Sequence, residues 1–358
     1  MRHALALARR ALGQTAPNPA VGCVIAGKDG RILGRGVTGR GGRPHGEAIA
    51  LGQAGLEAKG ATVYVTLEPC SHHGETPPCA DALIEARISR AVVAVGDPDP
   101  RVNGRGLARL REAGIEVVTG ILEEEAAALN AGFFSRLTKQ RPMVTLKLAM
   151  SLDGKIASGG GESRWITGVD ARAYGHLLRA KHDAILIGAG TAKADDPELT
   201  CRLPGLKDRT PVRVVLDSRL QLSAWSKLAR TAAENAVLLF TGSDEPGAAL
   251  QACGVEICRV RRDARGRPDV DAVLAELAKR GITRLLVEGG ASVHASFLDR
   301  GAADRLELFR GVLMLGGAGR DGIDPLLAMA LTEAPRFRIE EVRRLGADLL
   351  ESYGREGA

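Results

Sequence analysis

The chain of 358 residues has few aromatic side chains and no long hydrophobic run. Phe, Tyr and Trp make up only 3% of it, which leaves few surfaces on which nucleic-acid bases could stack. No stretch approaches the roughly 18 consecutive apolar residues of a membrane-spanning helix. The six cysteines show no paired framework of the secreted kind, which favours a reducing compartment. We therefore expect a cytoplasmic protein that binds neither nucleic acid nor membranes.

Size and charge indicate a two-domain protein that acts on small molecules. A chain of this length exceeds the usual size of one hydrophobic core. The net charge of +6 comes from 49 basic and 43 acidic residues without a long basic run, which suits phosphorylated small molecules at least as well as polynucleotides. Residues 1–13 are rich in Arg and Ala, as in a transit peptide, but their helical periodicity favours the first helix of a domain.

One histidine, one glutamate and two cysteines in the first half have the pattern of a catalytic zinc centre. His45 and Glu47 are separated by one residue, and Pro69-Cys70 is followed by Cys79. Zinc binds imidazole nitrogen and thiolate sulfur, and a catalytic zinc keeps its fourth position for water. In hydrolytic deaminases with the pattern H-x-E…P-C-x-x-C, the glutamate moves protons while His and both Cys hold the metal. We expect the same roles here.

The gap between the cysteines departs from that pattern, because eight residues separate Cys70 from Cys79 instead of two. This length argues against an ordinary base-editing or tRNA-type deaminase. A closed structural zinc site remains an alternative, with His72, His73 or Cys23 as fourth ligand. Against it, a predicted buried strand would deliver Cys70 at its carboxyl end, and Cys79 precedes a helical stretch whose amino end favours a thiolate.

Both halves alternate predicted strands and helices, which is typical of an α/β fold with a largely parallel sheet. In the first half we expect strands at residues 21–26, 62–67, 91–95 and 115–118, and helices at 46–53, 79–86, 105–113 and 123–134. In the second half we expect strands at residues 144–150, 184–187, 212–216, 236–240 and 284–287, and helices at 170–179 and 270–280. Gln140-Arg141-Pro142 is the expected boundary, which gives domains at residues 1–140 and 143–358.

The second half has no cluster of metal ligands in its sequence, so its candidate binding features are loops. Gly188-Ala189-Gly190-Thr191 lacks the third glycine of a dinucleotide fingerprint. Glu288-Gly289-Gly290-Ala291-Ser292 joins a strand to a helix, where N–H groups can face an anion, although simple turns explain its glycines equally well. Asp217-Ser218-Arg219 could meet a ribose or its 2′-phosphate. The arginine-rich residues 261–268 are most simply a solvated loop, although their charge also allows a role in binding phosphate.

Longer motifs occur in both halves. The first half contains Thr15-x-Pro17-Asn18-Pro19-x-Val21-Gly22-Cys23-Val24-Ile25, His45-x-Glu47 and Leu67-Glu68-Pro69-Cys70-Ser71-His72-His73-Gly74-x-Thr76-Pro77-Pro78-Cys79. The second half contains Thr145-Leu146-Lys147-Leu148-Ala149-x-Ser151-Leu152-Asp153-Gly154-Lys155-Ile156-Ala157, Gly161-Glu162-Ser163-Arg164-Trp165-Ile166-Thr167-Gly168, Asp195-Asp196-Pro197-x-Leu199-Thr200-x-Arg202 and Val287-Glu288-Gly289-Gly290. Together they resemble the bifunctional RibD family of riboflavin biosynthesis, from about residue 3 to about residue 320.

This resemblance implies a cytidine-deaminase-like α/β/α domain followed by a dihydrofolate-reductase-like α/β domain. The first domain would use Zn²⁺ to deaminate 2,5-diamino-6-ribosylamino-4(3H)-pyrimidinone 5′-phosphate. The second would use NADPH to reduce the ribosyl group, which gives 5-amino-6-(5-phosphoribitylamino)uracil. The implied partners are phosphorylated pyrimidines, and we expect a homo-oligomer.

The resemblance also implies roles for single residues. His45, Cys70 and Cys79 correspond to zinc ligands and Glu47 to the acid and base. The residues expected at NADPH are Ala149, Trp165, Thr191, Asp195, Ser218, Gly290, Ala291 and Ser292. The residues that the resemblance places at the substrate are Ser163, Arg179, Leu199, Arg202 and Glu288. Their chemistry agrees, since two arginines suit a phosphate and a carboxylate accepts hydrogen bonds from sugar hydroxyls. Lys147 and Asp153 are further candidates, for which ion pairing and turn formation are equally good explanations.

Three residues depart from the family's usual pattern. Gly46 stands where many relatives have Ala, which loosens the start of a helix by about 1 kcal/mol at most. Thr38 stands where relatives often have a substrate-contacting His. Glu75 stands where they usually have Lys or Arg, and its carboxylate would repel a substrate phosphate. The basic residues that could compensate are Arg40, Arg43 and Arg101.

Two alternative functions remain open. An enzyme with a single activity would keep its other domain for structure or binding. A nucleic-acid base deaminase would need clustered basic residues and stacking aromatics, which this composition does not supply.

Overall fold

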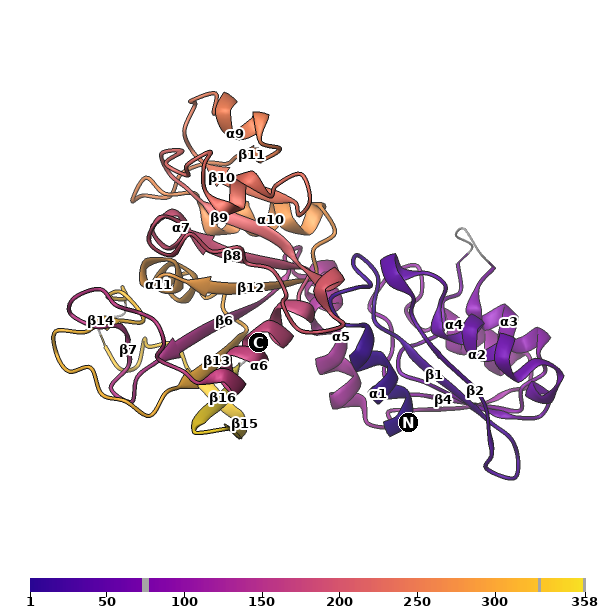
Figure 1. Ribbon diagram of the computed structural model, residues 1–358. Coiled ribbons are helices and arrows are strands. Elements are labelled where there is room, and N and C mark those ends of the chain that lie inside the picture. Colours follow the sequence, from indigo (N-terminus) through magenta and orange to yellow (C-terminus); the bar gives the residue numbers. More distant parts are fainter. Residues whose placement is uncertain (73–76, 328–329, 357–358) are drawn as a thin grey trace. The chain divides into compact units, whose positions relative to one another are not determined.

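The computed structural model describes residues 1–72, 77–327 and 330–356 (Figure 1). The chain divides into Met1–Arg141 and Pro142–Ala358, here called the N-terminal and C-terminal units. Each unit has its own sheet and its own buried core. Among the described helices, none is both long and apolar enough to cross a lipid bilayer.

A five-stranded sheet in the order β2-β1-β3-β4-β5 forms the centre of the N-terminal unit. Its strands are β1 (Gly22–Ala26), β2 (Ile32–Val37), β3 (Thr62–Val65), β4 (Arg90–Val93) and β5 (Glu116–Thr119). The last three are parallel, but β1 is antiparallel to both of its neighbours. The prediction of a largely parallel sheet is therefore wrong at the edge formed by β2 and β1. The prediction also omitted the strand β2. The reason is the short connection from β1 to β2, which can join only antiparallel strands.

Helices cover both faces of this sheet. One face carries α2 (Gly46–Ala54), α3 (Cys79–Glu85) and α4 (Arg105–Glu112), and the other carries α1 (Arg2–Ala11) and α5 (Glu123–Thr138). Two short 3₁₀ helices, η1 (Arg40–Gly42) and η2 (Gly55–Ala58), flank α2. Ala50, Leu83 and Leu110 pack on the first face, whereas Leu5 and Leu129 pack on the second. Residues 1–13 thus contribute the helix of a domain, as their periodicity predicted.

Two glycines allow α2 to lie unusually close to the sheet. A Cβ atom at Gly36 of β2 would stand 1.8 Å from the carbonyl oxygen of Gly46. A Cβ atom at Gly46 would stand 2.8 Å from the carbonyl oxygen of Val21. Since Cβ atoms do not approach backbone oxygen so closely, Gly46 has a packing role that its weak helix propensity did not indicate.

The C-terminal unit is built on a nine-stranded sheet in the order β11-β10-β9-β8-β12-β6-β13-β16-β15. The strands are β6 (Met143–Met150), β8 (Ala184–Gly188), β9 (Val212–Leu216), β10 (Val237–Thr241), β11 (Glu256–Arg259), β12 (Arg284–Gly289), β13 (Arg305–Arg310), β15 (Phe337–Leu345) and β16 (Asp348–Arg355). All neighbouring strands from β11 to β13 in this order are parallel. The hairpin of β15 and β16 extends the sheet, and β16 pairs antiparallel with both β13 and β15. A separate pair joins β7 (Lys155–Ala157) to β14 (Arg320–Asp321).

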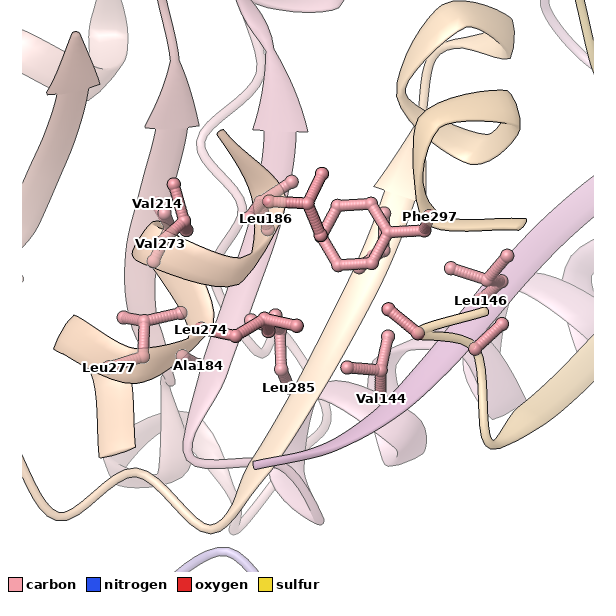
Figure 2. Packing of buried hydrophobic residues seen from close by; sticks show 14 of the residues in the cluster. Val144, Leu146, Ala184, Leu186, Val214, Val273, Leu274, Leu277, Leu285 and Phe297 are labelled. Atoms are coloured by element: carbon pink, nitrogen blue, oxygen red, sulfur yellow. The ribbon is translucent and has the colours of Figure 1, made fainter. Parts of the chain in front are cut away.

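Helices also cover both faces of the larger sheet. They are α6 (Val169–Ala180), α7 (Ala189–Asp195), α8 (Lys227–Arg230), α9 (Ala248–Ala252), α10 (Val270–Lys279) and α11 (Ala291–Asp299), with the 3₁₀ helix η3 (Lys207–Arg209). Figure 2 shows Leu274 and Leu277 of α10 and Phe297 of α11 directed toward Leu186 and Leu285 of the strands. The opposite face packs against α6, α8 and α9.

The predicted strands of this unit agree with β6, β8, β9, β10 and β12 to within two residues. These strands are apolar and central, so their composition identifies them. The prediction omitted β11, β13, β15 and β16. Seven of the nine residues of β15 are exposed, so its sequence carries no buried face by which a strand is recognised.

Candidate functional site

Three donor side chains meet on the N-terminal unit. His45 is the N-cap residue of α2, Cys70 follows β3, and Cys79 is the first residue of α3. Their ligand atoms all lie within 4.8 Å of one another. Within the described part of the chain, they form the only group of three or more potential His, Cys, Asp or Glu ligands.

The separations of these atoms fit a tetrahedral zinc site. His45 Nδ1 lies 3.2 Å from Cys79 Sγ and 3.6 Å from Cys70 Sγ. Ligands at ordinary Zn–S and Zn–N bond lengths are about 3.5–3.8 Å apart in a tetrahedron. One imidazole and two thiolates also match zinc in chemical type. The donor set therefore fits the metal that the sequence predicted.

Local hydrogen bonds stabilise thiolate character at Cys70. The hydrogen bond from the Cys79 thiol lowers the pKa of Cys70 to about 4, and raises the pKa of Cys79 itself. The backbone N–H of Cys79 donates to Cys70 Sγ at 3.3 Å, at the amino end of α3. His45, hydrogen-bonded to Cys70, has a raised pKa. One sulfur is thus prepared as an anionic ligand by protein groups alone.

Glu47 lies beside the donor group, in the first turn of α2, with only 3% of its surface exposed. Burial raises its pKa to about 7, although the nearby His45 charge acts in the opposite direction. A carboxyl group that titrates near neutral pH can both accept and return a proton. Glu47 therefore has the protonation behaviour that an acid and base needs.

The alternative of a fourth protein ligand has little support from the described residues. Cys23 is fully buried in β1, and burial raises the pKa of its thiol well above the ordinary value. Neither Cys23 nor His72 belongs to the group of ligand atoms. His73 lies outside the described residues. The three-donor set leaves a position open, as a catalytic zinc site requires.

Two of the departures from the family pattern concern the surroundings of this site. Thr38 is buried, and its Oγ1 accepts a hydrogen bond of 2.8 Å from the N–H of Val21, so it holds β1 in place. Glu75 lies outside the described residues. Arg101, one of the proposed compensating residues, is paired with Asp99 at 2.6 Å.

The loop that follows β4 is fastened to the metal-binding segment by a buried carboxylate. Glu68 Oε1 accepts the N–H groups of Gly106 at 3.0 Å and Leu107 at 3.4 Å, and Oε2 accepts that of Gly104 at 3.0 Å. Because Glu68 stands two residues before Cys70, these hydrogen bonds hold in place the segment of the chain that leads to Cys70. The sequence motif contained Glu68 but did not reveal this role.

A cleft of about 850 Å³ lies on the C-terminal unit, at the carboxyl ends of β6, β8, β9 and β12. Ligands of open α/β sheets bind at such strand ends. The residues predicted for NADPH that line it are Ala149, Trp165, Thr191, Asp195, Ser218, Gly290, Ala291 and Ser292. The residues predicted for the substrate that line it are Ser163, Arg179, Leu199, Arg202 and Glu288. The structure thus brings both predicted sets to one cleft.

Two of the predicted substrate residues are bound to each other. Arg179 of α6 donates from Nε and Nη2 to the two carboxylate oxygens of Glu288, at 2.8 and 2.9 Å. Lys147 Nζ lies 3.8 Å from the same carboxylate. Burial opposes the ionisation of Glu288, but the charges of Arg179 and Lys147 outweigh it and hold its pKa at about 2. Glu288 is consequently a fixed anion with lone pairs left for other donors.

Trp165 forms an exposed wall of the cleft, with 65% of its surface accessible. Arg172 stacks over its ring at 4.4 Å, and Arg164 lies 5.9 Å from the ring centre. Arg164 also donates to the carbonyl oxygen of Asp195 at 2.9 Å, which links this wall to α7. The cleft wall therefore carries an exposed indole with guanidinium groups close to its ring.

The two glycine loops meet at the centre of the cleft. A Cβ atom at Gly290 would stand 3.1 Å from Thr191 Oγ1, so the turn before α11 lies against α7. Gly289 has a φ of 119°, a backbone conformation that favours glycine. The amino end of α11 faces the cleft, where Gly290 and Ser292 are partly exposed and Ala291 is a buried residue of the lining.

Some candidates have structural roles, and other residues were missed. Asp153 is not among the cleft residues; its carboxylate accepts a local hydrogen bond from the hydroxyl of Ser151 at 2.6 Å. It also accepts the N–H groups of Leu315 and Gly316 at 3.1 and 2.7 Å and thereby fastens that distant segment to the turn at residues 151–154. Asp217 likewise accepts the N–H groups of Arg219 and Leu222. The missed cleft residues include Arg172, Gln221 and Lys227, which are far from the glycine loops in sequence. Arg267 of the arginine-rich segment also lines the cleft, so this segment is not only a solvated loop.

Comparisons with known proteins agree with both sites. Residues 1–95 match the cytidine and deoxycytidylate deaminase zinc-binding region, and residues 142–350 match the RibD C-terminal domain. Riboflavin biosynthesis protein RibD of Aquifex aeolicus is 41% identical over 355 residues, covering 99% of this chain and 97% of the relative. The Escherichia coli protein of the same name is 41% identical over 363 residues, covering 98% and 96%.

Solved structures show the same likeness over the whole chain. Acinetobacter baumannii RibD, form 1, has a TM-score of 0.88 at 37% identity and covers 99% of this chain and 97% of its own. The Thermotoga maritima diaminohydroxyphosphoribosylaminopyrimidine deaminase/5-amino-6-(5-phosphoribosylamino)uracil reductase has a TM-score of 0.88 at 39% identity, with the same coverage. The chain therefore belongs to the RibD family, the bifunctional deaminase and reductase enzymes of riboflavin biosynthesis.

Membership confirms several predictions made from the sequence. A cytidine-deaminase domain precedes a RibD C-terminal reductase domain, and both have a mixed α/β fold. The enzyme is a bifunctional deaminase and reductase with Zn²⁺ and NADPH as cofactors, and its substrates are small molecules.

Proposed function

We propose that the N-terminal unit removes the amino group of 2,5-diamino-6-ribosylamino-4(3H)-pyrimidinone 5′-phosphate, and that the C-terminal unit reduces the ribosyl group of the product to ribityl. The similar Thermotoga maritima protein, named as a deaminase and reductase of these phosphoribosyl pyrimidines, supports both substrates. The observation that carries the first assignment is the group of His45, Cys70 and Cys79 with buried Glu47 beside it.

In the deaminase site, we assign His45, Cys70 and Cys79 to the metal and Glu47 to proton transfer. Zinc held by three protein ligands lowers the pKa of water to about 7 and so supplies a nucleophile at neutral pH. An Oε atom of Glu47 accepts the proton of the attacking water and returns it to the exocyclic amine, which leaves as ammonia. Its pKa of about 7 permits both transfers without a large free-energy cost.

In the reductase site, we assign the glycine loops and Ser218 to NADPH and the residues around Glu288 to the sugar. NADPH supplies the hydride. Glu288, kept ionised by Arg179 and Lys147, accepts hydrogen bonds from ribosyl hydroxyls and orients the carbon that receives the hydride. Arg202 has an exposed guanidinium only 3.7 Å from Glu198, and it is well placed to exchange that weak pair for the substrate phosphate.

Two separate assays on the purified protein test this proposal. Ammonia release and NADPH oxidation are followed with the diaminopyrimidinone phosphate as the only pyrimidine supplied. We expect ammonia release without NADPH, and NADPH oxidation only after deamination. The rival function is an enzyme with a single activity. It would give only one of the two signals, either ammonia release or NADPH oxidation, even when the deaminated intermediate is supplied directly.

We also propose a cytoplasmic homo-oligomer that does not bind nucleic acid. All six cysteines are unpaired, which suits a reducing compartment. Sedimentation analysis would contradict the oligomer if it found only a monomer. Micromolar retention of single-stranded DNA or RNA at physiological salt would contradict the exclusion of nucleic acid.

A further inference from the structure

The segment from Glu198 to Arg202 belongs to neither a helix nor a strand, yet it forms part of the cleft wall. Glu198, Leu199 and Arg202 line the cleft. Leu199 is only 3% exposed and has a φ of 55°, in the left-handed region that residues other than glycine seldom adopt. Such a conformation persists only where surrounding contacts hold it. The hydrogen bonds of this segment therefore decide how it presents its side chains to a ligand.

Two arginines bind carbonyl groups on either side of Leu199. Arg213 of β9 is fully buried, and its Nη1 donates to the carbonyl oxygen of Glu198 at 3.2 Å. Arg179 of α6 donates from Nη1 to the carbonyl oxygen of Thr200 at 3.0 Å. The peptide groups before and after Leu199 are thus attached to two different elements of the C-terminal unit, which fixes the middle of the segment.

His176 of α6 contacts the last part of the same segment. Its Nδ1 lies 3.4 Å from the backbone nitrogen of Arg202 and 3.2 Å from the carbonyl oxygen of Thr200. Its own carbonyl oxygen accepts the thiol of Cys201 at 3.5 Å. The Thr200 oxygen already receives a hydrogen bond from Arg179, whereas the N–H of Arg202 has no other acceptor among the described residues. We therefore assign Nδ1 as the acceptor of the Arg202 N–H.

The surroundings of His176 agree with this assignment. Burial, and then the charges of Arg179 and Arg202, lower the pKa of His176 to about 4, although Glu288 acts in the opposite direction. The ring is neutral at physiological pH, and a proton on Nε2 leaves the lone pair of Nδ1 free. His176 is not among the described residues that line the cleft. It can consequently affect a ligand only through the segment that it holds.

We propose that His176 is a positioning residue for the reductase reaction, which fixes the backbone of Arg202 so that its guanidinium meets the substrate phosphate. This inference rests on the proposed assignment of Arg202 to that phosphate. The Arg202 side chain is 53% exposed, with Glu198 as its ion-pair partner at 3.7 Å, so it loses conformational entropy when it binds an anion. A fixed backbone reduces this loss and strengthens binding. The benefit is confined to substrates that carry the phosphate.

Steady-state oxidation of NADPH by the full-length protein tests this role. The two substrates are the deaminated intermediate and the same compound without its 5′-phosphate. His176→Phe keeps a ring of similar volume and removes Nδ1. We expect the KM of the phosphorylated compound to rise about 2- to 10-fold at unchanged kcat, as for loss of a hydrogen bond that supports binding. The kcat/KM of the compound without phosphate should stay the same. His176→Asn, whose side-chain oxygen can accept the same N–H, should recover most of the affinity.

Two further variants separate positioning from a general effect on the fold. Arg202→Ala should also raise the KM of the phosphorylated compound. Adding His176→Phe to Arg202→Ala should raise it no further, because His176 acts through Arg202. His182→Gln is the matched control: this second histidine near α6 is bonded to the Leu178 carbonyl and the Thr145 hydroxyl. Its loss should leave the KM of both compounds unchanged.

Several results would overturn the proposal. An unchanged KM in His176→Phe would show that the contact with Arg202 has no effect on binding. Equal losses with both compounds would mean that His176 only supports the shape of the cleft. Additive losses in the double variant would separate His176 from Arg202. An unchanged KM in Arg202→Ala would remove the phosphate from Arg202. Failure of the unaltered protein to oxidise NADPH with the intermediate would instead contradict the reductase assignment itself, so the two levels fail in distinguishable ways.

Discussion

The two units place their chemistry in different ways. In the N-terminal unit, three ligand atoms within 4.8 Å of one another and one buried carboxylate make up the reactive centre. In the C-terminal unit, the cleft receives residues from several strand ends, from two helix starts and from distant loops. Some of its polar groups hold one another, as Arg179 holds Glu288. A concentrated centre depends on a few side chains, whereas a distributed cleft depends on how the whole sheet is assembled.

The largest effect is expected at the concentrated centre. Glu47→Gln should lower the rate of ammonia release by about 10²–10⁴-fold, because the amide cannot carry a proton between water and amine. Zinc content and reduction of the deaminated intermediate should persist. Glu57→Gln, an exposed carboxylate on the same unit, serves as the matched control. A parallel fall of both activities would contradict two independent sites.

A buried ion pair tests how the distributed cleft is held together. Glu288→Gln leaves the Arg179 charge without its partner, so the free energy of unfolding should fall by about 3–5 kcal/mol. Glu341→Gln removes an exposed partner of Arg343 and should cost less than about 1 kcal/mol. Denaturant titration followed by circular dichroism measures both. Equal effects would mean that the buried pair contributes no more than a surface pair.

Metal content tests the membership of the ligand set. Cys79→Ser should weaken zinc binding at least about 10- to 100-fold, because even residues that only orient a ligand contribute that much. Zinc per chain is measured after dialysis against a weak chelator. Cys253→Ser, a half-buried cysteine of the other unit, should retain the metal of the unaltered protein. Undiminished zinc in Cys79→Ser would remove Cys79 from the site.

The smallest effect concerns acid sensitivity of the C-terminal unit. His182 is buried between the carbonyl oxygen of Leu178 and the hydroxyl of Thr145, and burial lowers its pKa to about 3. Unfolding restores a pKa near 6.5, so the unfolded state binds the proton more tightly. Stability is therefore lost as the pH falls below about 6.5.

Between pH 7.5 and 5.5 this loss should amount to about 1.4 kcal/mol. It is measured as the change in free energy of unfolding, and His182→Gln should reduce it. A variant with the same pH dependence as the unaltered protein would show that other groups cause the acid sensitivity.

The sequence prediction was strongest where local patterns decide structure. The apolar central strands β6, β8, β9, β10 and β12 were found to within two residues. It was weaker where distant pairing decides. The strand β15 is largely exposed and joins the sheet only through β16, and β2 depends on a hairpin turn with β1. Neither carries a continuous apolar face that would identify it alone.

Which chemical groups are available, and which of them are neighbours along the chain, follows from the amino-acid order alone. His45, Cys70, Cys79 and Glu47 could be named because zinc accepts few residue types as ligands and because these residues stand in a recognisable motif. That Arg179 binds Glu288 and that Arg267 reaches Ser292 depends on how distant segments come together in the folded protein. These partners are many residues apart, and their contact follows from strand order and helix placement, which no local spacing encodes.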